Sequence, residues 1–454
     1  MKFPKIMKLK SIIALSIMGC SLFNANGQNT YSLEQLKASA RQNNHALGQA
    51  RRNIEAAGQQ RAEAFTKYFP SVSATGLTFN ANKGMASMTV NPTEILPSSL
   101  LPSLEATFPA ELLATIGNPI NISMMKNGTI AGVTLMQPIF AGGQIVNGNR
   151  LAKVGEDVSK LQLALTVNEV DLKTEQYYWQ LISLQQKTLT LQAVDTLLSN
   201  IYRDVDAAVS AGVAMRNDLL QVQLRQNELA SQRLKLNNGC AIAKLLLSQH
   251  CGLNDTTFRV VSPDSIYAEP VAYVDTDAAL TSLAEYQLLN KQIEAAELNK
   301  KMAIGQNLPT LAVGAGYNYH NLLGNDRAFA MVFATVSIPL SGWWGGSHAI
   351  KRCELQRQNA IDKMTEKSEL LTIRMQSAWN DVNEAFQQLL IAERSIEQAK
   401  ENLRLNRDYY NAGISKMSDL LEAQLLYQQA LDSRTDAFVA YQIIALKYRQ
   451  ATAQ

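Results

Sequence analysis

The chain has 454 residues, of which 18% are charged, and its formal net charge is +3. Four lysines lie within the first ten residues, so the remainder carries a net charge of 3 − 4 = −1. Nucleic-acid binding needs a concentrated basic surface, and this composition argues against it. The four lysines near the start are Lys2, Lys5, Lys8 and Lys10.

Residues 1–27 are typical of a signal peptide. The basic start is followed by an apolar stretch over residues 11–23, which is too short to span a bilayer as a stable helix, and cleavage after Gly27 fits a small-x-small site. A second interpretation takes the residues before Cys20 as a lipoprotein box, which would leave Cys20 lipidated. Met18 suits that box poorly, so ordinary cleavage is preferred. Both interpretations predict export from the cytoplasm.

The first mature segment predicts a helix followed by two strands. Ser32 begins a capping box, which satisfies two backbone amides at a helix start, and the helix is expected to run to about Lys67. Strands are predicted over Pro70–Asn80 and Thr129–Phe140, which are rich in Ser, Thr and apolar residues. The intervening residues 81–127 contain five prolines. They predict an irregular loop with room for short helices.

Two very long helices are predicted over residues 144–210 and 347–411, because proline is absent from 139 to 262 and from 340 to the end. At 1.5 Å per residue each would be about 100 Å long. A glycine, Gly212 or Gly413, follows each helix and can supply the positive φ of a tight turn. A return helix of about 37–40 residues then closes a hairpin. Each long helix comes after a glycine pair, Gly142-Gly143 or Gly345-Gly346.

The second long helix carries a seven-residue repeat, in which alanine takes the second position of the seam. This pattern indicates helices packed closely in a coiled-coil manner. Its members are Met375, Val382, Leu389, Ile396 and Leu403, with Ala378, Ala385, Ala392 and Ala399.

The second half of the chain also predicts a strand pair. Pro309–His320 alternates apolar residues with small or polar ones, and a turn near Gly324–Asp326 leads to a strand over Ala328–Leu340. Each strand has about 11–12 residues, close to the length of a tilted membrane strand. Four strands cannot close a barrel alone, and a membrane does not tolerate open sheet edges. The chain is therefore predicted to share strands with identical copies.

The two halves are tandem repeats. Asp218-Leu219-Leu220 follows Ala211-Gly212 as Asp419-Leu420-Leu421 follows Ala412-Gly413. Internal symmetry of this kind decides architecture. We predict a first repeat at residues 28–254, a linker at 255–275 and a second repeat at 276–454. Residues 252–275, here called the joint, connect the two halves and are also expected to contain a short strand near Phe258–Val261.

These motifs together resemble the outer-membrane efflux protein family of TolC-like channel-tunnels, and the resemblance covers essentially the whole mature chain. It implies a mostly α protein with a β-hairpin in each of two tandem repeats. Three such chains would form a twelve-stranded outer-membrane β-barrel, continued by a long periplasmic α-helical barrel. The motifs are Tyr31-Ser32-Leu33, Gln137–Gly143, Asn307-Leu308-Pro309, Ser337–Leu340, Tyr410–Gly413 and Asp419–Gln424.

The resemblance implies a passive exit duct of a tripartite efflux or type I secretion system, set in outer-membrane lipid. Its partners would be two identical chains, a periplasmic adaptor (a membrane fusion protein) and an inner-membrane RND or ABC pump. Neither a cofactor nor an enzyme activity is implied, and the residues contain no catalytic constellation. The sequence identifies neither the exported substrate nor the pump class.

The family's aperture acids fall on Asp419 and Glu422. Three-fold symmetry would bring three copies of each to the axis, where like charges raise one another's pKa or recruit cations. A second interpretation is that Asp419 caps the return helix, as Asp218 would in the other half. The two roles are compatible.

The family's closed-state latch falls on Asp218 and Tyr410. Where the family has a basic residue two positions after the glycine, this chain has Ser415, with Lys416 next to it. The same tyrosine could instead be an ordinary packing residue. The turn tips that begin at Gly212 and Gly413 are where the hairpins of an adaptor would dock.

Two other classes remain open from the residues alone. A periplasmic adaptor also has long helical hairpins, but it would have one hairpin between lipoyl-like β segments. A secreted coiled-coil scaffold would have no membrane role. The four histidines lack ligand spacing, and three cysteines remain after residue 27, for which free thiols are favoured over a Cys240–Cys251 pair.

Overall fold

The computed structural model describes residues 29–91, 107, 109, 111, 118–262, 268–322, 325–340 and 342–453. The predicted signal peptide and Cys20 lie outside the described residues, as does most of the stretch from 92 to 117.

The chain divides into two compact units. One comprises the described residues of 1–51, 163–283 and 369–454, and the other comprises those of 52–162 and 284–368. Each unit contains segments from both predicted repeats, and each of the two longest helices contributes to both units. The repeat boundaries themselves stay a prediction.

The first helical segment begins as predicted but is broken once. The Ser32 side chain accepts from the Gln35 backbone, and the Gln35 side chain accepts in return from the Ser32 backbone, so the capping box is confirmed. The predicted single helix to Lys67 is wrong, because α1 (Leu33–Asn43) and α2 (His45–Thr66) are separated at Asn44. The Asn44 side chain accepts from Ala46 N at 2.9 Å and donates to the His250 carbonyl oxygen of α7 (Arg216–Cys251), which fixes the break.

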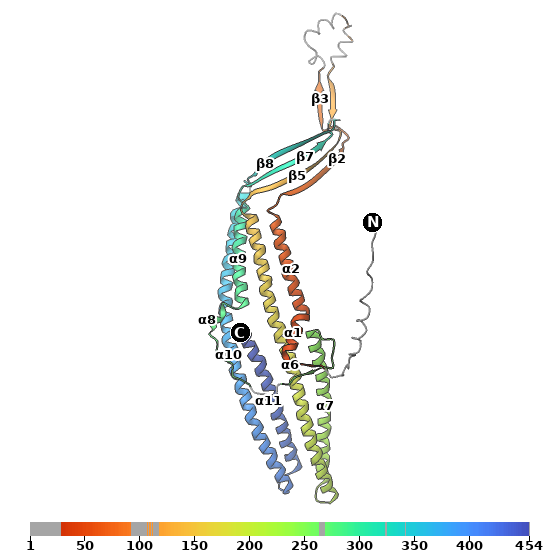
Figure 1. Cartoon of the computed structure of the whole chain (residues 1–454), viewed down its shortest axis with the longest axis vertical. Helices are drawn as coiled ribbons and strands as arrows, with labels where there is room; N and C mark the ends of the chain where they lie inside the picture. The colour runs from red at the N-terminus through yellow and green to blue at the C-terminus, as the bar shows by residue number, and fades with distance from the viewer. Residues whose placement is uncertain are drawn as a thin grey trace, which may run out of the picture. The chain divides into compact units, whose positions relative to one another are not determined.

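Four strands form one antiparallel sheet in the order β2-β5-β7-β8, which joins the two halves of the chain through β5 and β7 (Figure 1). The predicted strands are confirmed, although the last one ends at Ser337 rather than Leu340. Pro339 lacks the N–H that a ladder needs. The outer edges of β2 and β8 have no strand partner within the described part of the sheet. The strands are β2 (Ser71–Asn80), β5 (Asn127–Ala141), β7 (Thr310–His320) and β8 (Arg327–Ser337).

The prediction of an irregular loop over 81–127 is wrong at both of its ends. β3 (Ala86–Val90) and β4 (Ile120–Met124) pair antiparallel and form a second, two-stranded sheet. The five prolines that suggested an irregular loop lie between these strands and not in them, which is where proline interferes least with a ladder.

The close approach between the sheet and its helices depends on glycines. A Cβ on Gly142, whose φ is +58°, would lie 2.1 Å from the carbonyl oxygen of Gly305 at the end of α9 (Ala284–Gly305). The second glycine pair does not precede its helix as predicted, because α10 (Gly342–Asn411) already contains Gly345 and Gly346.

The two long helical hairpins are confirmed. Their turn glycines, Gly212 and Gly413, have φ values of +75° and +71°. The heptad seam of the second hairpin is buried at Met375, Val382 and Leu389. The long helices are α6 (Gln144–Ser210) and α10 (Gly342–Asn411), and the return helices are α7 (Arg216–Cys251) and α11 (Met417–Ala451).

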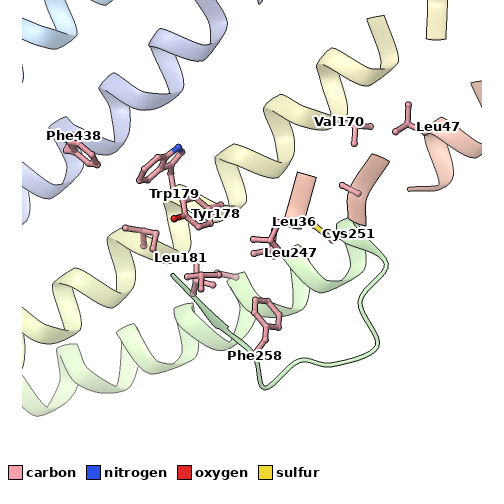
Figure 2. Close-up of a cluster of buried hydrophobic side chains, with 14 of the residues drawn as sticks. Leu36, Leu47, Val170, Tyr178, Trp179, Leu181, Leu247, Cys251, Phe258 and Phe438 are labelled. Carbon is pink, nitrogen blue, oxygen red and sulfur yellow. The ribbon is translucent and has the colours of Figure 1, made fainter. Parts of the chain in front are cut away.

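The expected short strand in the joint is β6 (Arg259–Val260), which pairs in parallel with β1 (Thr30–Tyr31). A short helix, α8 (Thr276–Leu280), follows it. Phe258, beside β6, is fully buried in the main core of the first unit (Figure 2). That core also contains Leu36 of α1, Leu181 of α6 and Leu247 of α7, so the ends of the first repeat and the joint share one apolar cluster.

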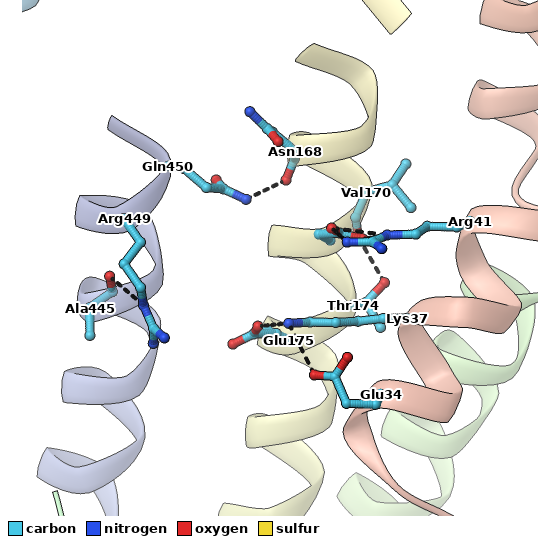
Figure 3. Close-up of polar contacts among 11 residues, drawn as sticks. Glu34, Lys37, Arg41, Asn168, Val170, Thr174, Glu175, Ala445, Arg449 and Gln450 are labelled. Carbon is cyan, nitrogen blue, oxygen red and sulfur yellow. Dashed lines mark hydrogen bonds and ion pairs between the residues drawn. The ribbon is translucent and has the colours of Figure 1, made fainter. Parts of the chain in front are cut away.

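Two buried carboxylates of α6 hold α1 in place. Asp171 accepts from Arg41 Nε at 3.0 Å, and Glu175 forms an ion pair with Lys37 (Figure 3). This hydrogen bond to Asp171 raises the pKa of the Arg41 guanidinium. The two basic residues are four residues apart on α1, and the two acidic residues are four residues apart on α6. Each set therefore lies on one face of its helix, one turn apart.

Cys240, Cys251 and Cys353 are free thiols, and burial raises the pKa of Cys251 to about 12. In the described part of the chain, none of the helices has the length and apolar character that crossing a membrane would require.

Candidate functional site

The two hairpin turns are built from the same local structure. Val213 N donates to Ala208 O at 2.9 Å, and Ile414 N donates to Tyr409 O at 2.8 Å. Each bond is made to the carbonyl oxygen five residues back along the chain, which defines a glycine-terminated helix end in which the glycine must take positive φ. The repeat in the sequence therefore marks a repeat of backbone geometry, as predicted for Gly212 and Gly413.

The residues at the tips of the turns expose large apolar side chains. Val213 is 80% exposed, Met215 is 74% exposed and Ile414 is 75% exposed. Scattered exposed apolar residues are ordinary on a protein surface. Here they occur at both of the equivalent turns, so each tip presents at least one large apolar side chain to solvent.

Beneath the turns, all four long helices contribute to one apolar cluster. It includes Leu198 of α6, Val222 of α7, Leu420 of α11 and, from α10, the partly buried Tyr410. The two hairpins of one chain are thus packed together within the first unit. Burial raises the pKa of the Tyr410 hydroxyl, and the charge of Asp218 raises it further. Leu219, the residue after Asp218, packs against the same apolar cluster as Tyr410, so the structure places the two residues of the predicted latch in one neighbourhood.

Asp419 forms the cap that was expected of it, whereas α7 begins without a side-chain cap, so the equivalent expectation for Asp218 is wrong. Its Oδ2 accepts from Lys416 N at 3.1 Å, and its Oδ1 accepts from Ser418 Oγ at 3.2 Å. Negative charge in the first turn of a helix is also favoured by the helix dipole. Both Asp419 and Glu422 are exposed and lie three residues apart on α11. Their carboxylates are accessible at the same end of the hairpin.

A buried polar network joins the two return helices, and sequence reasoning missed it. Arg225 of α7, only 8% exposed, donates from Nε to Gln424 Oε1 at 3.2 Å and from Nη2 to Gln428 Oε1 at 3.0 Å. Gln428 in turn donates to Gln232 Oε1 at 3.1 Å. The spacing in the sequence could have revealed this network. Gln424 and Gln428 are one helical turn apart and residues 225 and 232 are two turns apart, so each pair lies on one face of its helix.

Within the described residues, no group of three or more His, Cys, Asp or Glu side chains is placed to hold a metal ion. The candidate site is the exposed surface of the two turns together with the apolar packing beneath them.

Comparison with known proteins identifies the fold. No family model and no curated protein sequence matches the chain. Among solved structures, the chain is similar to the outer-membrane channel OprN (TM-score 0.74, 14% identity, 92% of this chain and 89% of that one). It is similar to CusC (TM-score 0.76, 13% identity, 94% and 92%), a protein described with transmembrane channel formation.

A third similar structure is the CmeC outer membrane channel of Campylobacter jejuni (TM-score 0.71, 16% identity, 92% and 85%). The chain has the fold of TolC-like outer-membrane channel proteins, and the likeness extends over nearly its whole length.

Proposed function

We propose that this chain is the outer-membrane exit duct of a tripartite efflux or type I secretion system, a passive trimeric channel-tunnel with a periplasmic helical tip. The observation that carries the proposal is one sheet whose two outer edges have no strand partner among the described residues, together with two long helical hairpins. The likeness of its fold to solved outer-membrane channels supports it.

Closure of the sheet requires further copies of the chain. The outer edges of β2 and β8 present rows of backbone N–H and C=O groups, and a membrane offers nothing to pair with them. The strands have 10, 15, 11 and 11 residues, against about 9–11 needed to cross the hydrocarbon core. Three chains would pair β8 of one with β2 of the next and form a twelve-stranded barrel.

The aperture of the channel is proposed at Asp419 and Glu422. Both are exposed near the hairpin tip, and three-fold symmetry would place six carboxylates around one axis. Repulsion among them would be relieved by bound cations or by protonation. The capping contact of Asp419 with Lys416 is compatible with this role, because a carboxylate has several lone pairs.

The latch is proposed at Asp218 and Tyr410. Their proximity supports it, since the Asp218 charge influences the titration of the Tyr410 hydroxyl. Ser415 stands where a basic residue would be expected, and its hydroxyl lies 3.5 Å from Asn406 O. The latch of this chain would therefore depend on the Asp218–Tyr410 pair and on packing.

The adaptor is proposed to dock on the turn tips, residues 212–217 and 413–418, through the exposed side chains of Val213, Met215 and Ile414. An inner-membrane RND or ABC pump would supply the energy, because the chain itself offers no nucleotide-binding motif.

Two measurements test this function. The full chain should be recovered from the outer-membrane fraction, and the purified protein should conduct ions in a planar bilayer. A soluble periplasmic protein without channel activity would favour the scaffold or adaptor class instead. Deletion of the gene followed by a drug-susceptibility panel would then report on the exported compounds.

A further inference from the structure

The two-stranded sheet formed by β3 and β4, here called the ribbon (Ala86–Val90 and Ile120–Met124), has one apolar face. In its register Met88 lies opposite Ile122, and Val90 lies opposite Ile120. Residues directly opposite one another in an antiparallel pair share a face. Ala86 and Met124 complete a face of six apolar side chains.

The other face of the ribbon is polar. Thr89 lies opposite Asn121, and its hydroxyl donates to Asn121 Oδ1. Ser87 lies on the same side of β3. The ribbon is thus amphipathic with period two, which is the pattern of a strand pair with one covered and one solvated face.

Nothing in the described chain covers the apolar face. Met88 is 55% exposed, Ile120 is 55% exposed and Ile122 is 43% exposed. A two-stranded ribbon alone is at best marginally stable in water. Its apolar face therefore needs a partner.

The ribbon lies beyond the part of the sheet that would cross a membrane. It continues β2 and β5, whereas the β7–β8 pair already ends at His320 and Arg327. Lys83 and Lys126 stand at its base, and Met125 takes a positive φ of 59° at the change of direction. Since the four strands already have the length needed to span the hydrocarbon core, acyl chains are the wrong partner for this face.

We infer that the apolar faces of three ribbons, one from each chain, pack against one another beyond the barrel. The inference rests on the proposed trimer. Closure of β2 and β8 between chains would set the three ribbons around one axis, each continuing the strand pair that begins at a sheet edge. Six apolar side chains from each copy would then form a small shared core outside the membrane.

A cross-linking experiment tests this surface. Met88→Cys and Thr89→Cys place a thiol on the apolar and polar faces of the same strand, and the unsubstituted chain gives the background from the native thiols. Purified particles of each are treated with a short bis-maleimide and run on a denaturing gel. We expect a dimer band from Met88→Cys and none from Thr89→Cys.

A second pair of variants tests the same contact by stability. Ile122→Thr should lower the temperature at which the trimer dissociates, whereas Thr89→Ser should leave that temperature unchanged.

The outcomes separate this inference from the proposed function. Native mass is measured on every variant first, and a chain that never forms a trimer defeats both. If both variants form trimers and cross-link to the same extent, the ribbon contact is overturned and the proposed trimer is not. A trimer in which Met88→Cys is protected from a charged maleimide but forms no dimer also overturns it, because another segment of the same chain would then cover the face.

Discussion

Arg225 Nη2 donates to Gln428 Oε1 at 3.0 Å, across 203 residues of sequence, and so ties the return helix of the first hairpin to that of the second. Both residues are buried, as is Gln424, the second acceptor. Leaving a buried polar group without its partner costs more than the hydrogen bond contributes when it is made. The network therefore fixes how the two hairpins of one chain lie against each other.

Arg225→Ala should loosen this contact. Each glutamine oxygen left buried without a donor costs about 1–3 kcal/mol, so amide hydrogen exchange should accelerate in α7 and α11 around residues 225 and 428. Arg233→Ala is the matched control, because Arg233 lies on the same helix in an exposed ion pair with Asp195 and such pairs contribute at most about 1 kcal/mol. Equal exchange in the two variants would mean that the network does not hold the hairpins.

Replacing the proposed aperture acids should open the resting channel. The double variant Asp419→Ala with Glu422→Ala removes six carboxylates from the proposed axis, and we expect higher conductance and weaker cation block in planar bilayers. Asp419→Asn separates charge from capping, since its amide oxygen can still accept from Lys416 N. Glu397→Ala, an exposed carboxylate of α10, is the control that should leave conductance unchanged. Unaltered conductance in the double variant would remove the aperture role.

The turn glycines are needed for their backbone conformation and not for space. No atom lies within 4 Å of a Cβ built on Gly212 or Gly413, yet both have positive φ. Alanine at either position should therefore cost about 1–2 kcal/mol. Gly58→Ala is the control, because Gly58 lies inside α2 with equally open surroundings, and there alanine should stabilise by about 0.5–1 kcal/mol. Thermal unfolding midpoints that shift in the same direction would contradict this explanation.

Asp432 should make the stability of the helical unit depend on pH. Burial raises the pKa of its carboxyl, Lys187 opposes the change, nearby Asp436 raises it further, and a hydrogen bond with Gln428 lowers it. The folded chain thus binds this proton more tightly than the unfolded chain does. Stability is greatest below the unfolded pKa and falls as the pH rises through the folded pKa.

Asp432→Asn should accordingly raise the unfolding temperature at neutral pH, and the gain should vanish in mild acid. Asp436→Asn is the matched control, because that exposed carboxylate pairs with Lys187 at 2.7 Å and its loss should produce a slight destabilisation. A gain for Asp432→Asn that is the same at both pH values would show that the charge of this carboxyl is not the cause.

The sequence predicted those features that depend on local or periodic signals. Gly212 and Gly413 mark turns because few other residues adopt positive φ, and the heptad of α10 marks a seam because packing requires it. The break at Asn44 was missed, since a side chain that bonds to α7 more than 200 residues away leaves no local trace. The ribbon was missed because the prolines between its strands led to the prediction of an irregular loop over the whole segment. Arg225 was missed because an arginine among glutamines is typical of a solvated helix face.

The most direct test of the account is the native mass of the detergent-extracted full chain. Because the outer edges of β2 and β8 have no strand partner in the described part of the chain, we expect three copies of the polypeptide in one particle. A stable, folded particle containing a single copy would contradict this, because its membrane strands would then have found closure without their neighbours.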